Sequence, residues 1–397
     1  MSGLASTIRS PIAGNSGASS AAGRATCEML VSSAVGIGAI DRGLLTAPMV
    51  KALSSTAFSI LLPMFLGTSI IKTVTTYGLS RSSLAVPLLA IVHSSLLFAL
   101  TTRIAFPLLR IDADSDDARG TAICSSFCNS SVVPLIFCES LFRDSMAEGG
   151  ADKLAQSTAY VSLFLVGWSP FFWSFGRSVL IGSGGETAEV DASWRGKVLS
   201  SVKTALPPPV VGVLVGMVVA TTPLRRLFVS TEEHEAPLAV VYNTAQNFGR
   251  AASPLSLLVL VSSLALGAGF GGEGGAEAPA PKVSAKYEDA GEVPFLTRWS
   301  LVSLTRFIVS PAVMYGLLCT AARNGVIGTS EKLPMLWFVC MLEACMPPAQ
   351  NLVVMLQVAD KMRKAGEMAA FLFSIYATSM LPIVIILSIA LEKFGLA

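Results

Sequence analysis

The sequence is poor in charged residues and in histidine. Asp, Glu, Lys and Arg make up 14% of its 397 residues, and only two histidines are present. A soluble globular protein usually carries about 25% charged residues. The net charge is +2, so neither a basic nucleic-acid footprint nor an acidic solvating tail is indicated. This shortage of charge argues against a protein whose surface is mostly in water.

Residue sets that carry catalysis or hold a metal are also scarce. Two histidines and no paired Asp in an apolar stretch provide little for an intramembrane enzyme, which stays a remote alternative. Seven cysteines are present, nearly all in apolar stretches, where cysteine packs as a small hydrophobic residue. Cys124 and Cys128 share one helix face, but no nearby His or Cys pair completes a metal site. We therefore expect no cofactor and no metal.

Long apolar stretches fill most of the chain. Hydrophobic residues make up 52% of it, and the mean hydropathy is +0.65. A membrane-spanning helix needs about 20 mainly apolar residues. The sequence therefore predicts an all-α membrane protein with ten spans, at residues 25–41, 50–74, 83–109, 119–142, 158–181, 206–222, 237–268, 296–322, 333–358 and 366–391. Membrane lipid is an expected partner, and nucleic acid is not.

Polar and small residues mark the ends of the predicted units. Residues 1–24 contain no Asp or Glu and are rich in Ser, Ala and Gly. Organellar transit peptides and disordered tails share this composition, and both interpretations stay open. A polar connecting loop at 182–205 separates a first unit, 25–181, from a second, 206–397. A Gly-, Ala- and Pro-rich linker at 271–294 is expected to be flexible.

Arginine and proline recur in the same order in the two units. Arg103 stands four residues before Pro107 in the third stretch, and Arg306 stands five residues before Pro311 in the eighth. The two arginines could attract an anion, pair with Glu343 or bond to carbonyls freed by the nearby prolines. Each unit has five stretches, an odd number, so the two units must enter the membrane from opposite sides. This is the inverted-repeat design of many secondary transporters.

The fourth and ninth stretches are both interrupted by proline beside polar residues, and we expect these breaks to cross near the middle of the membrane. Unwound backbone is tolerated in a membrane only where it faces protein or a water-filled cavity. Half-helix N-termini at such a crossing direct partial positive charge at an anion. The candidate substrate-binding residues are Asn129, Ser130, Ser131, Pro134, Pro347, Pro348, Gln350 and Asn351. Helix capping by the two asparagines and simple proline kinks are the structural alternatives.

Three ionisable side chains in apolar stretches are candidates for coupling transport to protons, namely Glu343, Glu139 and His93. Intramembrane carboxylates are costly and point to function, and burial disfavours their charged form. Glu139 lies close to Arg143 and Asp144 and could instead sit at the membrane interface, while Glu343 could pair with a neighbouring helix. His93 could relay protons or pack as a neutral side chain.

Several short segments follow one another along the chain, from about residue 25 to its end, in an order that a known family shares. They are Asn129-Ser130-Ser131-Val132-Val133-Pro134-Leu135, Ala159-Tyr160-Val161-Ser162, Pro207-Pro208 with Gly216, Ala236-Pro237-Leu238 leading to Ala252-Ser253-Pro254, and Pro347-Pro348-Ala349-Gln350-Asn351 with Gln357. With these segments the chain resembles the PIN-like transporters (the PILS group) of the auxin efflux carrier family. Ser131 and Val132 stand where the family usually has Gly and Asn, which makes the first break less flexible and less polar.

The resemblance implies ten transmembrane helices in two inverted five-helix repeats, with broken fourth and ninth helices that cross. It implies a secondary transporter, not an enzyme, that moves a small organic anion such as indole-3-acetic acid by alternating access. It also associates the chain with the endoplasmic reticulum. A sodium- or proton-coupled transporter of another carboxylate with the same fold is the alternative. The plasma membrane and the plastid envelope stay open as locations, as does assembly into a homodimer.

Overall fold

The fold is that of a computed structural model. It describes Gly23, Cys27, Val31, Leu206 and residues 34–78, 80–130, 132–143, 150–182, 208–230, 235–267, 293–359 and 361–396. The part so described consists of helices and their connections, with no strand among them. The predicted tail at 1–24, the connecting loop at 182–205 and the linker at 271–294 lie almost entirely outside the described residues, and so does Ser131.

The first unit contains eleven labelled helical segments among the described residues, where η marks a π-helical turn. These are α2 (Ala47–Thr56), η1 (Ala57–Leu61), α3 (Leu62–Tyr77), α4 (Arg81–Leu100), η2 (Thr101–Ala105), α5 (Phe106–Leu109), α6 (Asp116–Ser126), α7 (Val132–Arg143), α8 (Gly150–Phe171), η4 (Phe172–Gly176) and α9 (Arg177–Ile181). The predicted fourth span is thus interrupted between α6 and α7, at the position that its polar residues indicated.

The second unit is built in a similar way. Its described segments are α11 (Pro208–Thr221), α12 (Arg225–Phe228), α13 (Ala239–Arg250), α14 (Ala252–Gly267), α15 (Phe295–Leu304), η6 (Thr305–Val309), α16 (Ser310–Arg323), α17 (Pro334–Ala344), α18 (Asn351–Val358) and α19 (Met362–Lys393). The ninth span is interrupted between α17 and α18. The predicted seventh span is two helices, α13 and α14, since Pro254 cannot donate a hydrogen bond to the preceding turn.

Helices long and apolar enough to cross a membrane occur in both units. Within the described ranges there are four such stretches, at Ala47–Thr76, Arg81–Leu109, Phe295–Arg323 and Arg363–Lys393. Shorter apolar helices lie at Val133–Phe142, Pro208–Thr221 and Pro334–Ala344. Each of these three is too short to span the hydrocarbon core alone, because a span needs about 20 residues. The architecture is that of an all-α membrane protein.

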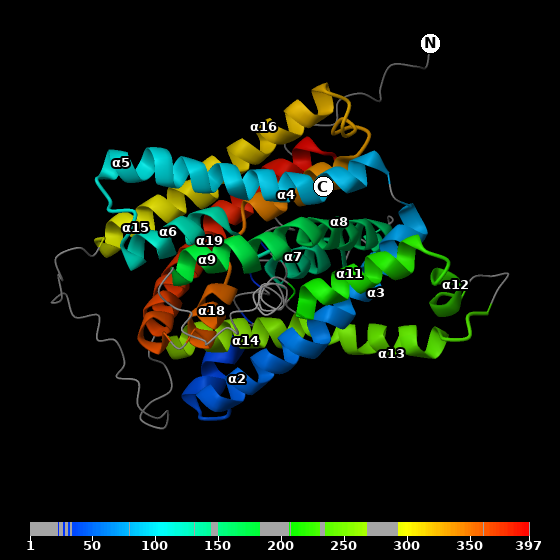
Figure 1. Ribbon diagram of the computed structural model, residues 1–397, viewed down its shortest axis with the longest axis horizontal. Helices are drawn as coiled ribbons and strands as arrows, with labels where there is room; N and C mark the ends of the chain where they lie inside the picture. The colour runs from blue at the N-terminus through cyan, green and yellow to red at the C-terminus, as the bar shows by residue number, and fades with distance from the viewer. Residues whose placement is uncertain are drawn as a thin grey trace, which may run out of the picture.

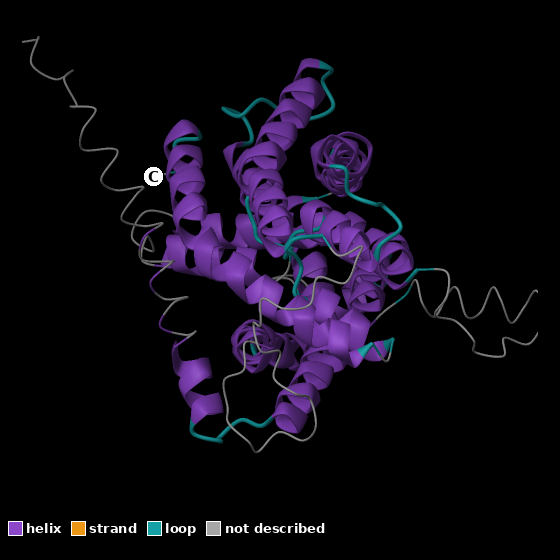
Figure 2. Cartoon of the chain, turned by 90° about the vertical axis from the view of Figure 1, so that its left-hand side faces the viewer, coloured by secondary structure: helices purple, strands orange, loops and turns teal. Residues whose placement is uncertain are grey.

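The helices form two outer groups with other helices between them. Figure 1 shows α2, α3, α11, α13 and α14 along one side, with the long helices α4 and α16 on the other and α7, α8 and α19 between them. The groups are joined where α3 and α11 pack on α8 and where α14 packs on α19. Turned by 90°, the molecule has loop segments near its centre as well as at its edges (Figure 2). The fold therefore carries non-helical backbone into its interior.

Close backbone contacts hold the helices together at glycines. A Cβ atom on Gly212 of α11 would lie 2.3 Å from the carbonyl oxygen of Pro63 in α3, and one on Gly167 of α8 would lie 2.1 Å from that of Pro87 in α4. Helices in membranes associate through such small residues, because lipid provides no hydrophobic force between them. The glycines allow α3 to approach α11, and α4 to approach α8, more closely than any side chain would permit.

A π-helical turn precedes a proline at equivalent places in the two units. In the first unit η2 runs into α5, which has Pro107 in its first turn, and in the second unit η6 runs into α16, which has Pro311 there. Proline obstructs the carbonyl four residues earlier, and a π-helical turn accommodates such a disturbance without ending the helix. Arg103 lies within η2, and Arg306 lies within η6.

Candidate functional site

The broken fourth and ninth helices meet backbone to backbone. The N–H of Asn129 donates to the carbonyl oxygen of Pro347 at 2.8 Å, and the N–H of Ala349 donates to that of Phe127 at 3.0 Å. These bonds flank a single antiparallel bridge between the two breaks. Each break thus satisfies backbone groups that the other has freed, as a crossing in a membrane interior requires.

A side-chain network holds this crossing in the interior. Asn129 is 3% exposed, and its amide Nδ2 donates to the hydroxyl of Tyr376 at 2.8 Å. That hydroxyl donates in turn to the carbonyl oxygen of Pro348 at 2.9 Å. The amide of Asn129 thus links the first break to Tyr376, which in turn binds the second break. Tyr376 comes from α19 and was missed in the sequence, although a buried tyrosine hydroxyl needs a partner.

The carboxyl group of Glu343 faces the first break. Glu343 lies at the end of α17 with an exposed fraction of 0%. Its Oε2 atom is 3.9 Å from the Sγ atom of Cys128, which lies 2.9 Å from the hydroxyl of Ser130. Its Oε1 atom has no hydrogen-bond partner in the described part of the chain. The structure thus brings Glu343 and Ser130 together with the crossing.

The guanidinium of Arg306 is fully buried and bonds to the C-terminal end of α17. Its Nε atom donates to the carbonyl oxygen of Met346 at 2.9 Å, and its Nη2 atom donates to those of Ala344 at 3.1 Å and Glu343 at 3.4 Å. These carbonyl oxygens belong to the second break, before Pro347, and not to the turn before Pro311 in the helix of Arg306 itself. Arg103 is exposed, although its sequence position in the repeat is equivalent.

His93 connects the two units behind this cluster. Its Nε2 atom lies 3.1 Å from both the carbonyl oxygen and the hydroxyl of Ser310, and that hydroxyl donates to the carbonyl oxygen of Ala344 at 2.6 Å. His93 is fully buried in α4, and its Nδ1 atom has no partner among the described residues. The histidine therefore supports the end of α17 through Ser310, a residue that the sequence did not single out.

The remaining predicted residues lie in α7 and at the start of α18. Pro134 is buried within α7, while Gln350 and Asn351 are partly buried at the start of α18. Gln350 has a buried Oε1 atom without a partner in the described residues. Glu139 is partly buried further along α7 and has interactions of its own.

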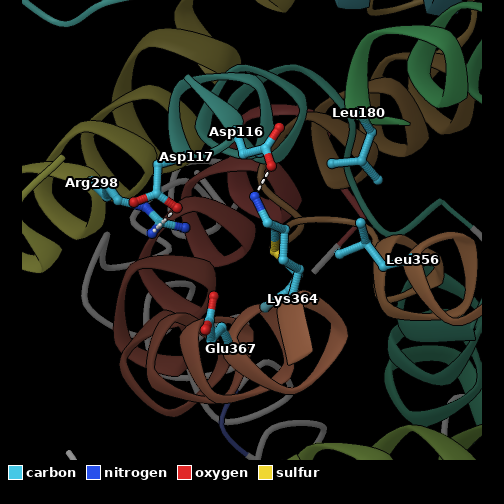
Figure 3. A pocket seen from close by; sticks show the side chains of 9 residues that line it. Asp116, Asp117, Leu180, Arg298, Leu356, Lys364 and Glu367 are labelled. Carbon is cyan, nitrogen blue, oxygen red and sulfur yellow. Dashed lines mark ion pairs between the residues drawn. The ribbon is translucent and has the colours of Figure 1, made fainter. Parts of the chain in front are cut away.

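A second polar cluster lies at the other end of α6. Figure 3 shows Lys364 pointing toward Asp116, and Arg298 toward Asp117, around a small pocket that Glu367 also lines. The Nη1 atom of Arg298 lies 2.7 Å from the Oδ1 atom of Asp117, and Lys364 forms an ion pair with Asp116. Both carboxylates lie in the first turn of α6, where their negative charge interacts favourably with the positive end of the helix dipole. Such partly exposed ion pairs connect α6 to α15 and α19 but add little stability.

The crossing offers groups that bind, and few that react. The N-termini of α7 and α18 and the C-termini of α6 and α17 all lie beside it, so it combines the positive ends of two helix dipoles with the negative ends of two others. Within the described ranges, no group of three or more His, Cys, Asp or Glu side chains could hold a metal ion. The arrangement suits reversible binding of a small polar or charged molecule.

Comparison with known proteins gives one further finding. The sequence profile of a family described as "Membrane transport protein" matches residues 24–387. The matched region includes both breaks, Glu343 and Arg306, and thus covers the whole candidate site. A search of curated proteins finds no match.

Proposed function

Because the chain belongs to the membrane transport protein family, which includes the auxin efflux carriers, we propose that it is a secondary transporter of a small organic anion. Membership of this family indicates a membrane transporter. The observation that supports transport of a small organic anion is the buried crossing of two broken helices, one from each unit. The backbone bonds of Asn129 and Ala349 join these helices. Crossings of this kind form substrate sites in inverted-repeat transporters.

Helix contacts support an arrangement of residues 25–181 and 206–397 as inverted five-helix repeats. The packing of α7 on α8 corresponds to that of α18 on α19. The contact of α3 with α8 likewise corresponds to that of α14 with α19. The third and eighth spans also contact each other, through α4 and α16, as equivalent spans beside a twofold axis would. Alternating access then follows from movement of the helices around the crossing relative to the group of α2, α3, α11, α13 and α14.

The substrate we propose has a carboxylate and an apolar aromatic body, as indole-3-acetic acid has. The carboxylate would meet the N-termini of α7 and α18, with Asn129, Ser130, Gln350 and Asn351 as hydrogen-bonding side chains. An aromatic cluster beside the first break supports an aromatic body. The ring of Phe127 lies 5.4 Å from that of Phe171 and 5.3 Å from that of Phe172, between ring centroids.

A proton-coupled transporter of another carboxylate is the second candidate. The buried carboxyl group of Glu343 beside the crossing favours it, because carboxyl groups inside membranes commonly form proton relays in transporters. The endoplasmic reticulum is the membrane we propose for either candidate, on the resemblance to the PIN-like group.

Uptake into proteoliposomes tests the proposal. The purified protein, reconstituted into liposomes, should accumulate radiolabelled indole-3-acetic acid or another carboxylate from a panel, above the level in protein-free liposomes. Competition by unlabelled carboxylates, but not by the matching amides, should accompany that uptake. If folded protein takes up no carboxylate of the panel, the proposal is wrong.

A further inference from the structure

The C-terminal end of α17 is a place where a cation is expected. The last carbonyl groups of a helix have no partner within it, and they carry the negative end of the helix dipole. In transporters with discontinuous helices, such half-helix C-termini and unwound carbonyls coordinate sodium ions or protons. In this chain, α17 ends at Ala344 directly before the break at Pro347 and Pro348, so its terminal carbonyls meet the crossing.

A side chain already occupies this position. The guanidinium of Arg306 donates to three carbonyl oxygens of residues 343, 344 and 346 at 2.9–3.4 Å, and none of its surface is exposed. The hydroxyl of Ser310 donates to the carbonyl oxygen of Ala344 as well. The acidic group nearest in sequence to these carbonyls is that of Glu343, which is also fully buried. A positive charge and the three carbonyl oxygens that it binds thus form a compact buried cluster.

We propose that Arg306 is a tethered cation that takes the place of a soluble coupling ion at the crossing, so that transport by this chain does not depend on sodium. This inference rests on the proposed transport function. A planar guanidinium with five N–H donors can satisfy several carbonyl oxygens at once, and it remains charged throughout a transport cycle. Because it is part of the chain, no ion gradient can be coupled through this position.

The equivalent arginine of the first unit provides a matched control. Arg103 lies in η2 as Arg306 lies in η6, and both turns precede a proline. Arg103 is exposed on the outer surface of the helix, whereas Arg306 points to the interior. Removing either residue changes the same side chain in the same local backbone, but only one of the two removals vacates the position beside the carbonyls.

Thermal unfolding of purified variants tests this inference without any transport assay. Arg306→Ala should unfold several degrees lower than the wild type, and millimolar guanidinium or methylguanidinium should raise its melting temperature. Tetramethylammonium, which has no N–H donor, should not do so. Arg103→Ala should respond to guanidinium no more than the wild type does. An Arg306→Ala variant that unfolds like the wild type, or that guanidinium does not stabilise, would overturn the inference.

Replacement of sodium provides a measurement that does not depend on a variant that folds. Carboxylate uptake by the wild type should be unchanged, within twofold, when sodium is replaced by potassium or N-methylglucamine. Loss of uptake on this replacement would contradict the tethered-cation role while leaving the transport function established. Absence of all carboxylate uptake would instead contradict the transport function, and the guanidinium experiment would still decide the role of Arg306.

Discussion

Single residues at the crossing are constrained from several sides. Asn129 uses its backbone N–H for Pro347 and its side-chain amide for Tyr376, so it contributes to both the backbone pairing and the side-chain network. Glu343 differs from it, because one carboxyl oxygen has no partner in the described part of the chain. An unsatisfied buried oxygen is costly, and it is retained most readily where the group changes its protonation or its partner during function.

The role of Glu343 can be separated from its packing. Glu343→Gln keeps the shape of the side chain but cannot release a proton, so we expect slower uptake with a flatter dependence on pH than in the wild type. Initial rates of uptake into proteoliposomes between about pH 5 and 8, the range in which proteins are commonly most stable, measure this. The exposed Glu331→Gln should keep the wild-type profile. A Glu343→Gln variant with normal protein levels and an unchanged pH profile would leave Glu343 with a structural role only.

Helices in this molecule are positioned by interruptions and by glycines. The breaks between α6 and α7 and between α17 and α18 place four helix termini in the interior. By contrast, the π-helical turn η2 joins α4 to α5, and η6 joins α15 to α16, without a break. Glycine contacts bring the backbones of α3 and α11 together. The interruptions therefore shape the crossing, and the glycines allow close helix packing beside it.

The contact of α11 with α3 should be sensitive to a single methyl group. In Gly212→Ala the new Cβ atom would overlap the carbonyl oxygen of Pro63, and overpacking of this kind costs about 1–3 kcal/mol. Gly316→Ala in α16 meets open space and should be neutral or stabilise the helix by up to about 1 kcal/mol. Thermal unfolding in detergent measures both. Equal stability of the two variants would show that α3 and α11 do not depend on close approach.

At the scale of the whole molecule, the two units share an order of elements that their sequences share only weakly. In each unit, a π-helical turn that contains an arginine is followed by a proline, and the next span is a broken helix. The proposed five spans in each unit predict that equivalent loops lie on opposite sides of the membrane. The loop between α5 and α6 and the loop between α16 and α17 are one such pair.

Labelling from one side of the membrane tests this inversion. In a Cys27→Ser background, Asp114→Cys and Thr329→Cys place one thiol in each of these two loops, at positions that are exposed. A membrane-impermeant maleimide added to sealed vesicles of uniform orientation should label only one of the two variants, and detergent should make both reactive. Labelling of both in sealed vesicles would mean that the units enter the membrane from the same side.

The sequence predicted those features of the fold that depend on local chemistry. Runs of apolar residues indicated the helices, and the polar residues beside Pro134 and Pro347 indicated where two of them break. It did not distinguish Arg103 from Arg306, because the two arginines have similar neighbours in the chain and differ only in the helices that pack around them. The bonds of Tyr376 and Ser310 to the breaks were likewise beyond prediction, since they join residues far apart in the sequence.

The central claim is that the crossing of the two broken helices binds the substrate, and equilibrium binding to purified variants tests it most directly. Affinities of the wild type, Asn129→Ala and Asn351→Ala for radiolabelled indole-3-acetic acid, or for the carboxylate best transported, should be compared with that of Asn324→Ala, an exposed asparagine at the end of α16. Loss of one hydrogen bond to a charged ligand costs about 1.5–3 kcal/mol, or roughly 10- to 150-fold in affinity. The first two variants should therefore bind at least tenfold more weakly while unfolding within a few degrees of the wild type, and Asn324→Ala should bind normally. Full affinity in both crossing variants, or a loss of fold without a separate loss of affinity, would contradict the claim.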